Sequence, residues 1–227
     1  VVGLGKSVIG CAIAKKLRKR GIVIAPPGLV GDKERTAGWR KYIEEFGLFD
    51  WDVWSLGDLE NATEFAKNSG GIEVVIIDEA HRFRNQDTKA YELLKNICRG
   101  RQVVLLTATP FNNSPEDILS LLKLFVTPKH SNIGLETDLA SQFSIFKSDF
   151  DKLGFIRKNW NSKDASKKQK AINFNLNLFS DTQIDLKRIA GATRNLANEI
   201  RGVIEPVTIR RNRLDLMNNP KCAEEVG

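Results

Sequence analysis

Short apolar runs alternate with amphipathic segments along the first half of the chain, and this alternation predicts its fold. The strand-like runs cover residues 22–25, 51–56, 72–78 and 102–109. The segments with helical periodicity cover 6–21, 38–47, 58–68, 88–100 and 114–126. An apolar run without polar alternation is typical of a strand covered on both faces. The pattern therefore predicts an α/β fold, with a parallel sheet sandwiched between helices.

Residues at the ends of these segments have the types that begin or stop helices. Gly21 is a stop signal for the first helix, because glycine readily adopts the conformation that ends a helix. Asp58 and Ser114 stand where N-cap residues belong, and Pro115 follows at the first helical position.

The pattern changes after residue 127, which predicts a second region. Residues 138–201 have helical periodicity with a polar break at 159–170, and residues 202–211 resemble extended chain. We therefore expect a lobe at 1–127, a helical insertion at 128–201 and a return strand within 202–227.

Composition narrows the classes of function. The 227 residues include 41% apolar residues and carry a net charge of +7, which is compatible with a polyanionic partner without showing one. Two histidines and three cysteines without a C-x-x-C pair argue against a zinc site, a histidine-rich metal centre or a disulfide framework, and favour a reducing compartment. We expect no membrane association, because no apolar run is long enough to span a bilayer and the first residues do not form a signal peptide.

The first residues, VVGLGKS, match the end of a P-loop, G-x-x-x-x-G-K-[ST]. The candidate nucleotide-binding residues are Gly3, Leu4, Gly5, Lys6 and Ser7. Backbone N–H groups and the following helix N-terminus favour phosphate, Lys6 would neutralise it, and Ser7 would offer a hydroxyl to Mg²⁺. The first motif position would precede Val1, and the alternative is an ordinary glycine turn before a helix.

The stretch VVIIDEAH places two carboxylates at the end of an apolar strand. Asp78 fits a Walker B aspartate that holds Mg²⁺ through water, and Glu79 fits the carboxylate that deprotonates the attacking water. The alternative is that Glu79 caps the next helix while Asp78 pairs with a lysine. Both motifs would lie at the carboxyl ends of the strands, where ligands bind in open parallel sheets.

Four blocks of sequence, taken together, resemble motifs I, Ia, II and III of helicase superfamily 2. They are GLGKS at 3–7, IVIAPPGLV at 22–30, DEAH at 78–81 and LLTATP at 105–110. The stretch LTATPFNNSPEDILSLLKLF at 106–125 is similar to Swi/Snf-type ATPases in particular.

The resemblance implies a RecA-like first lobe that binds ATP and Mg²⁺ against a second RecA-like lobe, with residues 202–227 leading into the linker. His81, Thr107 and Thr109 match residues that couple the nucleotide site to motif III. Pro27, Gly28 and Leu29 match the motif Ia loop, which contacts the DNA backbone in relatives. Without the arginines of a second lobe, we expect this fragment to bind nucleotide but to hydrolyse it poorly.

The basic and aromatic residues give a weaker signal for nucleic acid. We interpret residues 15–20, KKLRKR, as cations that complement a helix C-terminus, whereas 163–170, KDASKKQK, is equally consistent with a DNA contact. Trp39, Trp51 and Trp54 fall in predicted core segments, so packing is the better explanation for them.

The leading hypothesis is the ATP-binding first lobe of a Swi/Snf-type translocase of double-stranded DNA. One alternative is the motor subunit of a restriction or phage-defence system, and another is a regulatory module that binds nucleotide without hydrolysis. The expected location is the nucleoid-associated cytoplasm in a prokaryote or the nucleus in a eukaryote.

Overall fold

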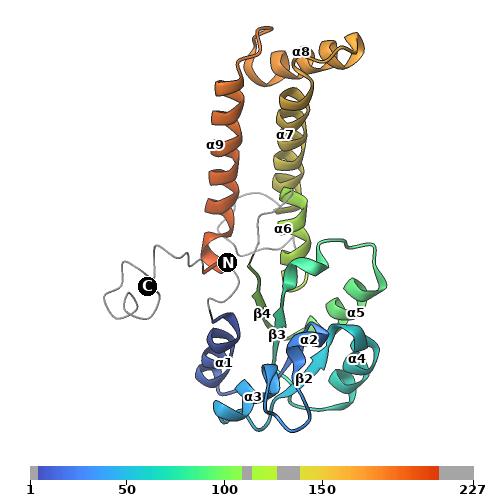
Figure 1. Cartoon of the computed structure of the whole chain (residues 1–227), viewed down its shortest axis with the longest axis vertical. Coiled ribbons are helices and arrows are strands. Elements are labelled where there is room, and N and C mark those ends of the chain that lie inside the picture. The colour runs from blue at the N-terminus through green and yellow to red at the C-terminus, as the bar shows by residue number, and fades with distance from the viewer. Residues whose placement is uncertain (1–4, 109–113, 127–138, 210–227) are drawn as a thin grey trace, which may run out of the picture. The chain divides into compact units, whose positions relative to one another are not determined.

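A computed structural model describes residues 5–108, 114–126 and 139–209 of the chain (Figure 1). The chain divides after Thr127 into two compact units. The first unit contains a sheet, and the second contains long helices.

The first unit is built on four parallel strands in the order β2-β1-β3-β4. The strands are β1 (Gly21–Ala25), β2 (Asp52–Ser55), β3 (Val74–Asp78) and β4 (Gln102–Leu106). Every residue of the two central strands, β1 and β3, is buried, as their unbroken apolar runs predict. The predicted α/β fold with a parallel sheet is therefore confirmed.

Helices cover both faces of this sheet (Figure 1). The strand residues alternate between the two sides. Ile22, Ile24 and Ile77 pack with α4 (Leu59–Asn68) and α5 (Lys89–Cys98). Val23, Ala25 and Ile76 pack on the other face with α1 (Lys6–Leu17) and α3 (Gly38–Glu45). The unit also contains three short helical turns: α2 (Pro27–Val30), η1 (Leu56–Asp58) and η2 (Ala80–Phe83). A longer helix, α6 (Pro115–Leu122), completes it.

Helices α3 and α5 follow β1 and β3 but lie on opposite faces of the sheet. The connection from β1 leads to β2 on one side of the pair, whereas the connection from β3 leads to β4 on the other side. A crevice forms at such a switch point, outside the carboxyl ends of the strands.

Some predicted boundaries need correction. Helix α1 ends at Leu17, with Arg18 in the left-handed region at φ 53°, so Gly21 does not stop the helix. Gly21 begins β1 instead, where a Cβ would lie 2.5 Å from a ring carbon of Trp51. Asp58 and Ser114 occupy the predicted N-cap positions, although neither side chain caps its helix.

The second unit contains three helices among its described residues: α7 (Leu139–Asn159), α8 (Ala165–Phe179) and α9 (Leu186–Ile204). The predicted break at 159–170 is confirmed for residues 160–164, between α7 and α8, but it is wrong for 165–170, which begin α8. A second break at 180–185 was not predicted. Asn175 supports this second turn by donating from its buried amide to Asp181 O at 2.8 Å and to Gln183 O at 3.0 Å.

The predicted extended chain at 202–211 is wrong for its first six residues. Helix α9 continues to Ile204, and the 3₁₀ turn η3 (Glu205–Val207) follows. Pro206 lies in the first turn of η3, a position that tolerates proline because the N–H group there needs no partner within the helix. Residues 208–209 belong to no helix or strand, and residues 210–227 lie outside the described residues.

Candidate nucleotide site

The predicted motifs that the structure describes gather at the carboxyl edge of the parallel sheet. Asp78 is the last residue of β3, and Glu79 and His81 follow it directly. Thr107 comes just after β4, whose Leu106 pairs with Asp78 in the sheet register. Gly3, Leu4 and Thr109 lie outside the described residues.

Lys6 and Ser7 begin α1 beside this edge. Gly5 precedes them with φ 64° and ψ 30°, a left-handed conformation that glycine adopts without a steric cost. The first turn of α1 contains no acidic residue, and no side chain among the described residues caps it. A helix N-terminus of this kind favours an anion through its backbone N–H groups and its dipole.

Lys6 and Glu79 form an ion pair that joins the two motifs. Their Nζ and Oε1 atoms are 3.4 Å apart, and each side chain is only about one-fifth exposed. The second carboxylate oxygen, Glu79 Oε2, lies 3.1 Å from His81 Nδ1. His81 Nδ1 is also 3.4 Å from Thr107 Oγ1. The structure therefore links motif I, motif II and the first threonine of motif III through direct side-chain contacts.

Glu79 has the left-handed backbone conformation, with φ 51° and ψ 45°. A non-glycine residue in this region is uncommon and carries strain of about 1–3 kcal/mol. The alternative that Glu79 caps a helix through its side chain is not supported, because that side chain makes no cap hydrogen bond to η2. Strain of this kind is characteristic of functional sites.

Asp78 is 1% exposed, and both of its carboxylate oxygens accept hydrogen bonds. Oδ1 accepts from the backbone N–H of Glu79 at 2.8 Å, and Oδ2 accepts from the indole N–H of Trp39 at 2.9 Å. Sequence reasoning placed Trp39 in the core and missed its polar partner, 39 residues away. The alternative that Asp78 pairs with a lysine is not what the structure contains, since these donors are a backbone amide and an indole.

Pro27, Gly28 and Leu29 lie at the same edge, directly after β1. They form most of the single turn α2 rather than a loop, and all three are exposed. Their exposed position would allow contact to a polyanion backbone.

A second set of contacts joins the segment after motif II to helix α6. Arg84 Nη1 lies 3.6 Å from Asp117 Oδ2. Gln86 Nε2 donates to Ser120 Oγ at 2.7 Å, and Lys123 Nζ donates to Gln86 Oε1 at 3.0 Å. The sequence predicted α6 but gave no signal for these partners, because the pairs are more than 30 residues apart.

The other predicted surface residues lie elsewhere. Trp39 and Trp51 are 1% and 5% exposed and Trp54 is half-buried, so the packing interpretation is confirmed for these three. The basic stretch at 15–20 ends α1, with Lys15 and Lys16 in the last turn. The stretch at 163–170 forms the start of α8, and most of its residues are exposed.

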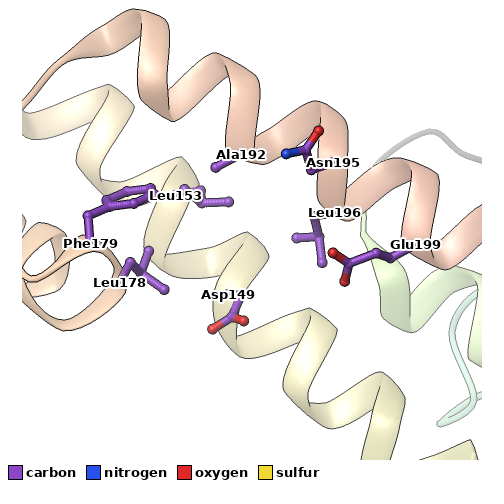
Figure 2. Close-up of a pocket in the computed structure, with 8 residues that line it drawn as sticks. All are labelled: Asp149, Leu153, Leu178, Phe179, Ala192, Asn195, Leu196 and Glu199. Carbon is purple, nitrogen blue, oxygen red and sulfur yellow. The ribbon is translucent and has the colours of Figure 1, made fainter.

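The second unit has a pocket of its own between α7, α8 and α9 (Figure 2). Its lining residues are Asp149, Leu153, Leu178, Phe179, Ala192, Asn195, Leu196 and Glu199. Two carboxylates on an apolar floor, without a cation among these residues, do not suit a phosphate group. The carboxyl edge of the sheet is the better candidate site.

Residues 47–226 match the SNF2-related domain family, so the chain belongs to that family, as the resemblance to Swi/Snf-type ATPases predicted. The chain is 31% identical over 170 residues to the uncharacterized ATP-dependent helicase YqhH of Bacillus subtilis, covering 66% of this chain and 29% of that protein. It is 43% identical over 75 residues to mouse chromodomain-helicase-DNA-binding protein 6, covering 33% of this chain and 3% of that protein. The chain thus spans less than a third of each of these two relatives.

Among solved structures, the chain matches the Sulfolobus solfataricus SWI2/SNF2 ATPase core in complex with dsDNA. It matches at a TM-score of 0.42 and 15% sequence identity, over 90% of this chain and 59% of that chain.

Among the residues that the structure describes, no helix is both long and apolar enough to cross a membrane.

Proposed function

We propose that this chain is the ATP-binding first lobe of a DNA-dependent ATPase that moves along double-stranded DNA. The observation that carries the proposal is the contact chain from Lys6 through Glu79 and His81 to Thr107. Membership of the SNF2-related family, and a relative named as an ATP-dependent helicase, support it.

The residues present fit ATP with Mg²⁺. The N-terminus of α1 and Lys6 would hold the phosphates, while Ser7 and, through water, Asp78 would hold Mg²⁺, which neutralises the charge that develops during phosphoryl transfer. Glu79 would accept a proton from water as its oxygen bonds to the γ-phosphorus and the bond to ADP breaks. In the present arrangement Glu79 is paired with Lys6, so phosphate binding would free the carboxylate by giving Lys6 another anion.

His81 and Thr107 would pass the nucleotide state on from Glu79, because both lie in the contact chain that leaves it. The partners we propose are a second RecA-like lobe of the same protein and the backbone of duplex DNA. Pro27, Gly28 and Leu29 would contact that backbone, and Thr109 would act beside Thr107. Contacts to phosphates carry little sequence information, so binding should depend strongly on salt and weakly on sequence.

Phosphate release by the full-length protein tests this function. It is measured at one low salt concentration without nucleic acid and with duplex DNA, single-stranded DNA or RNA. Strong stimulation by duplex DNA is the expected result. Stimulation by single strands or RNA alone would indicate an unwinding helicase, and ATP binding without turnover would indicate a regulatory module.

A further inference from the structure

Trp39 lies between helix α1, which begins with Lys6, and the end of strand β3. Its indole N–H donates to Asp78 Oδ2 at 2.9 Å, and both residues are 1% exposed. Its ring also contacts α1, because a Cβ added to Gly10 would lie 2.7 Å from Trp39 Cη2. The side chain therefore lies between the helix that follows the P-loop and the Walker B carboxylate.

The backbone before Trp39 is fixed by two glycines that approach each other closely. Gly31 has φ 94°, and a Cβ there would lie 2.0 Å from Ala37 O. Gly38 has φ 63°, and a Cβ there would lie 2.6 Å from Gly31 N and 2.7 Å from Leu29 O. This contact attaches the start of α3 to the turn that contains Leu29, so the position of Trp39 is set by the motif Ia segment.

A buried carboxylate that serves a metal must be held in one orientation. Asp78 has two donors, the backbone N–H of Glu79 on Oδ1 and Trp39 on Oδ2. Each carboxylate oxygen can accept about two hydrogen bonds, so these two donors leave acceptor capacity on both oxygens that metal-bound water could use. The two donors fix the plane of the carboxylate without using up its capacity.

We propose that Trp39 is a positioning residue that orients Asp78 for Mg²⁺. The proposal rests on the proposed function, in which Asp78 serves the metal. Partners that hold metal ligands in place typically contribute about 10–100-fold to metal affinity or activity. Because Asp78 would act through water, we expect an effect near the lower end, about 10-fold.

The chain provides a matched control in Trp51. This residue is 5% exposed, donates its indole N–H to Lys19 O at 3.0 Å, and also lies against a glycine, Gly21. Lys19 precedes β1, so this hydrogen bond lies at the opposite, amino edge of the sheet. Trp39→Phe and Trp51→Phe remove the same atoms from two buried sites, and only one of these sites contains Asp78.

The test measures binding of a fluorescent ATP analogue to the full-length protein, in EDTA and across a Mg²⁺ titration. In EDTA both variants should bind the analogue as the unsubstituted protein does. In the titration Trp39→Phe should raise the Mg²⁺ concentration for half-maximal tight binding by about 10-fold, while Trp51→Phe should leave it unchanged. An equal Mg²⁺ requirement in the two variants would overturn the proposal.

Two further variants keep the result interpretable. If Trp39→Phe does not fold, benzothienylalanine at position 39 keeps the shape of the side chain and lacks the N–H, and it should show the same 10-fold shift. Asp78→Asn must itself raise the Mg²⁺ requirement. If it does not, the role of Asp78 in the proposed function fails and the inference with it; if it does and both changes at position 39 leave the requirement unaltered, the inference alone fails.

Discussion

Two lysine–glutamate ion pairs flank strand β3, one at each edge of the sheet. At the carboxyl edge Lys6 and Glu79 lie 3.4 Å apart, with side chains 20% and 21% exposed. At the amino edge Lys19 and Glu73 lie 3.1 Å apart, with side chains 37% and 54% exposed. Glu73 immediately precedes β3 and Glu79 immediately follows it.

The surroundings of these pairs differ more than their distances do. Glu79 contacts His81 and follows the buried Asp78, whereas Glu73 lies on an edge where polar groups are satisfied by the fold itself. Arg101, for example, donates there to Ile72 O at 3.1 Å and to Ala66 O and Ile97 O at 2.6 Å each. A surface ion pair contributes only about 0–1 kcal/mol to stability, so the two pairs themselves do not distinguish the edges. Because their surroundings differ, we interpret the amino edge as structural and the carboxyl edge as functional.

Glu79→Gln should have the largest effect. The amide cannot accept the proton of water, so ATP turnover by the full-length protein should fall by about 10²–10⁴-fold while ATP affinity is kept. Glu73→Gln is the matched control, and it should leave turnover unchanged. Turnover that survives Glu79→Gln would remove Glu79 from the mechanism.

The reactivity of the Cys98 thiol shows whether the packing at the amino edge excludes solvent. Burial raises the pKa of this thiol to about 12 and that of Cys11 to about 11. An unperturbed cysteine has a pKa of about 8.5, so Cys98 should hold about 10³–10⁴-fold less thiolate at neutral pH than an unfolded thiol. Iodoacetamide labelling followed by peptide mass spectrometry measures this protection. Labelling of Cys98 in the folded protein at the rate of the unfolded protein would show that the edge is open.

Arg101→Ala should weaken the amino edge without affecting the chemistry. The change leaves carbonyl groups at the ends of α4 and α5 without their donor, and it should lower the free energy of unfolding by about 2–3 kcal/mol. Urea denaturation measures the loss, and turnover per folded molecule is the control. A normal stability would contradict the structural role of Arg101.

Thr107→Val should have the smallest effect. It removes the hydroxyl that contacts His81, and residues between two coupled sites typically change the coupling by about 0.5–2 kcal/mol. We expect a several-fold loss of stimulation by duplex DNA with basal turnover unchanged. Equal loss of basal and stimulated rates would place Thr107 in the chemistry or the packing rather than in the coupling.

The sequence predicted the sheet well because its signals there are local. The unbroken apolar run of β3 and the carboxylates that follow it are adjacent in the chain, so their position at a strand end could be read directly. Lys6 and Glu79 were expected at the same edge for the same reason, and the structure pairs them.

The sequence could not reveal features that depend on distant packing. The hydrogen bond from Trp39 to Asp78 needs two glycines to bring α3 against the turn after β1. The left-handed conformation of Glu79 is held by surrounding contacts and has no signature in the residue type. The continuation of α9 through Ile204 was missed, because residues 202–211 were expected to be extended chain.

Binding of ATP to the full-length protein and to its Lys6→Ala and Lys19→Ala variants tests the central claim most directly, namely that the carboxyl edge alone binds nucleotide. The account predicts that Lys6→Ala abolishes measurable binding, because the phosphates lose their cation, and that Lys19→Ala binds normally. Unchanged affinity after Lys6→Ala, or equal losses in both variants, would contradict the assignment of the nucleotide site.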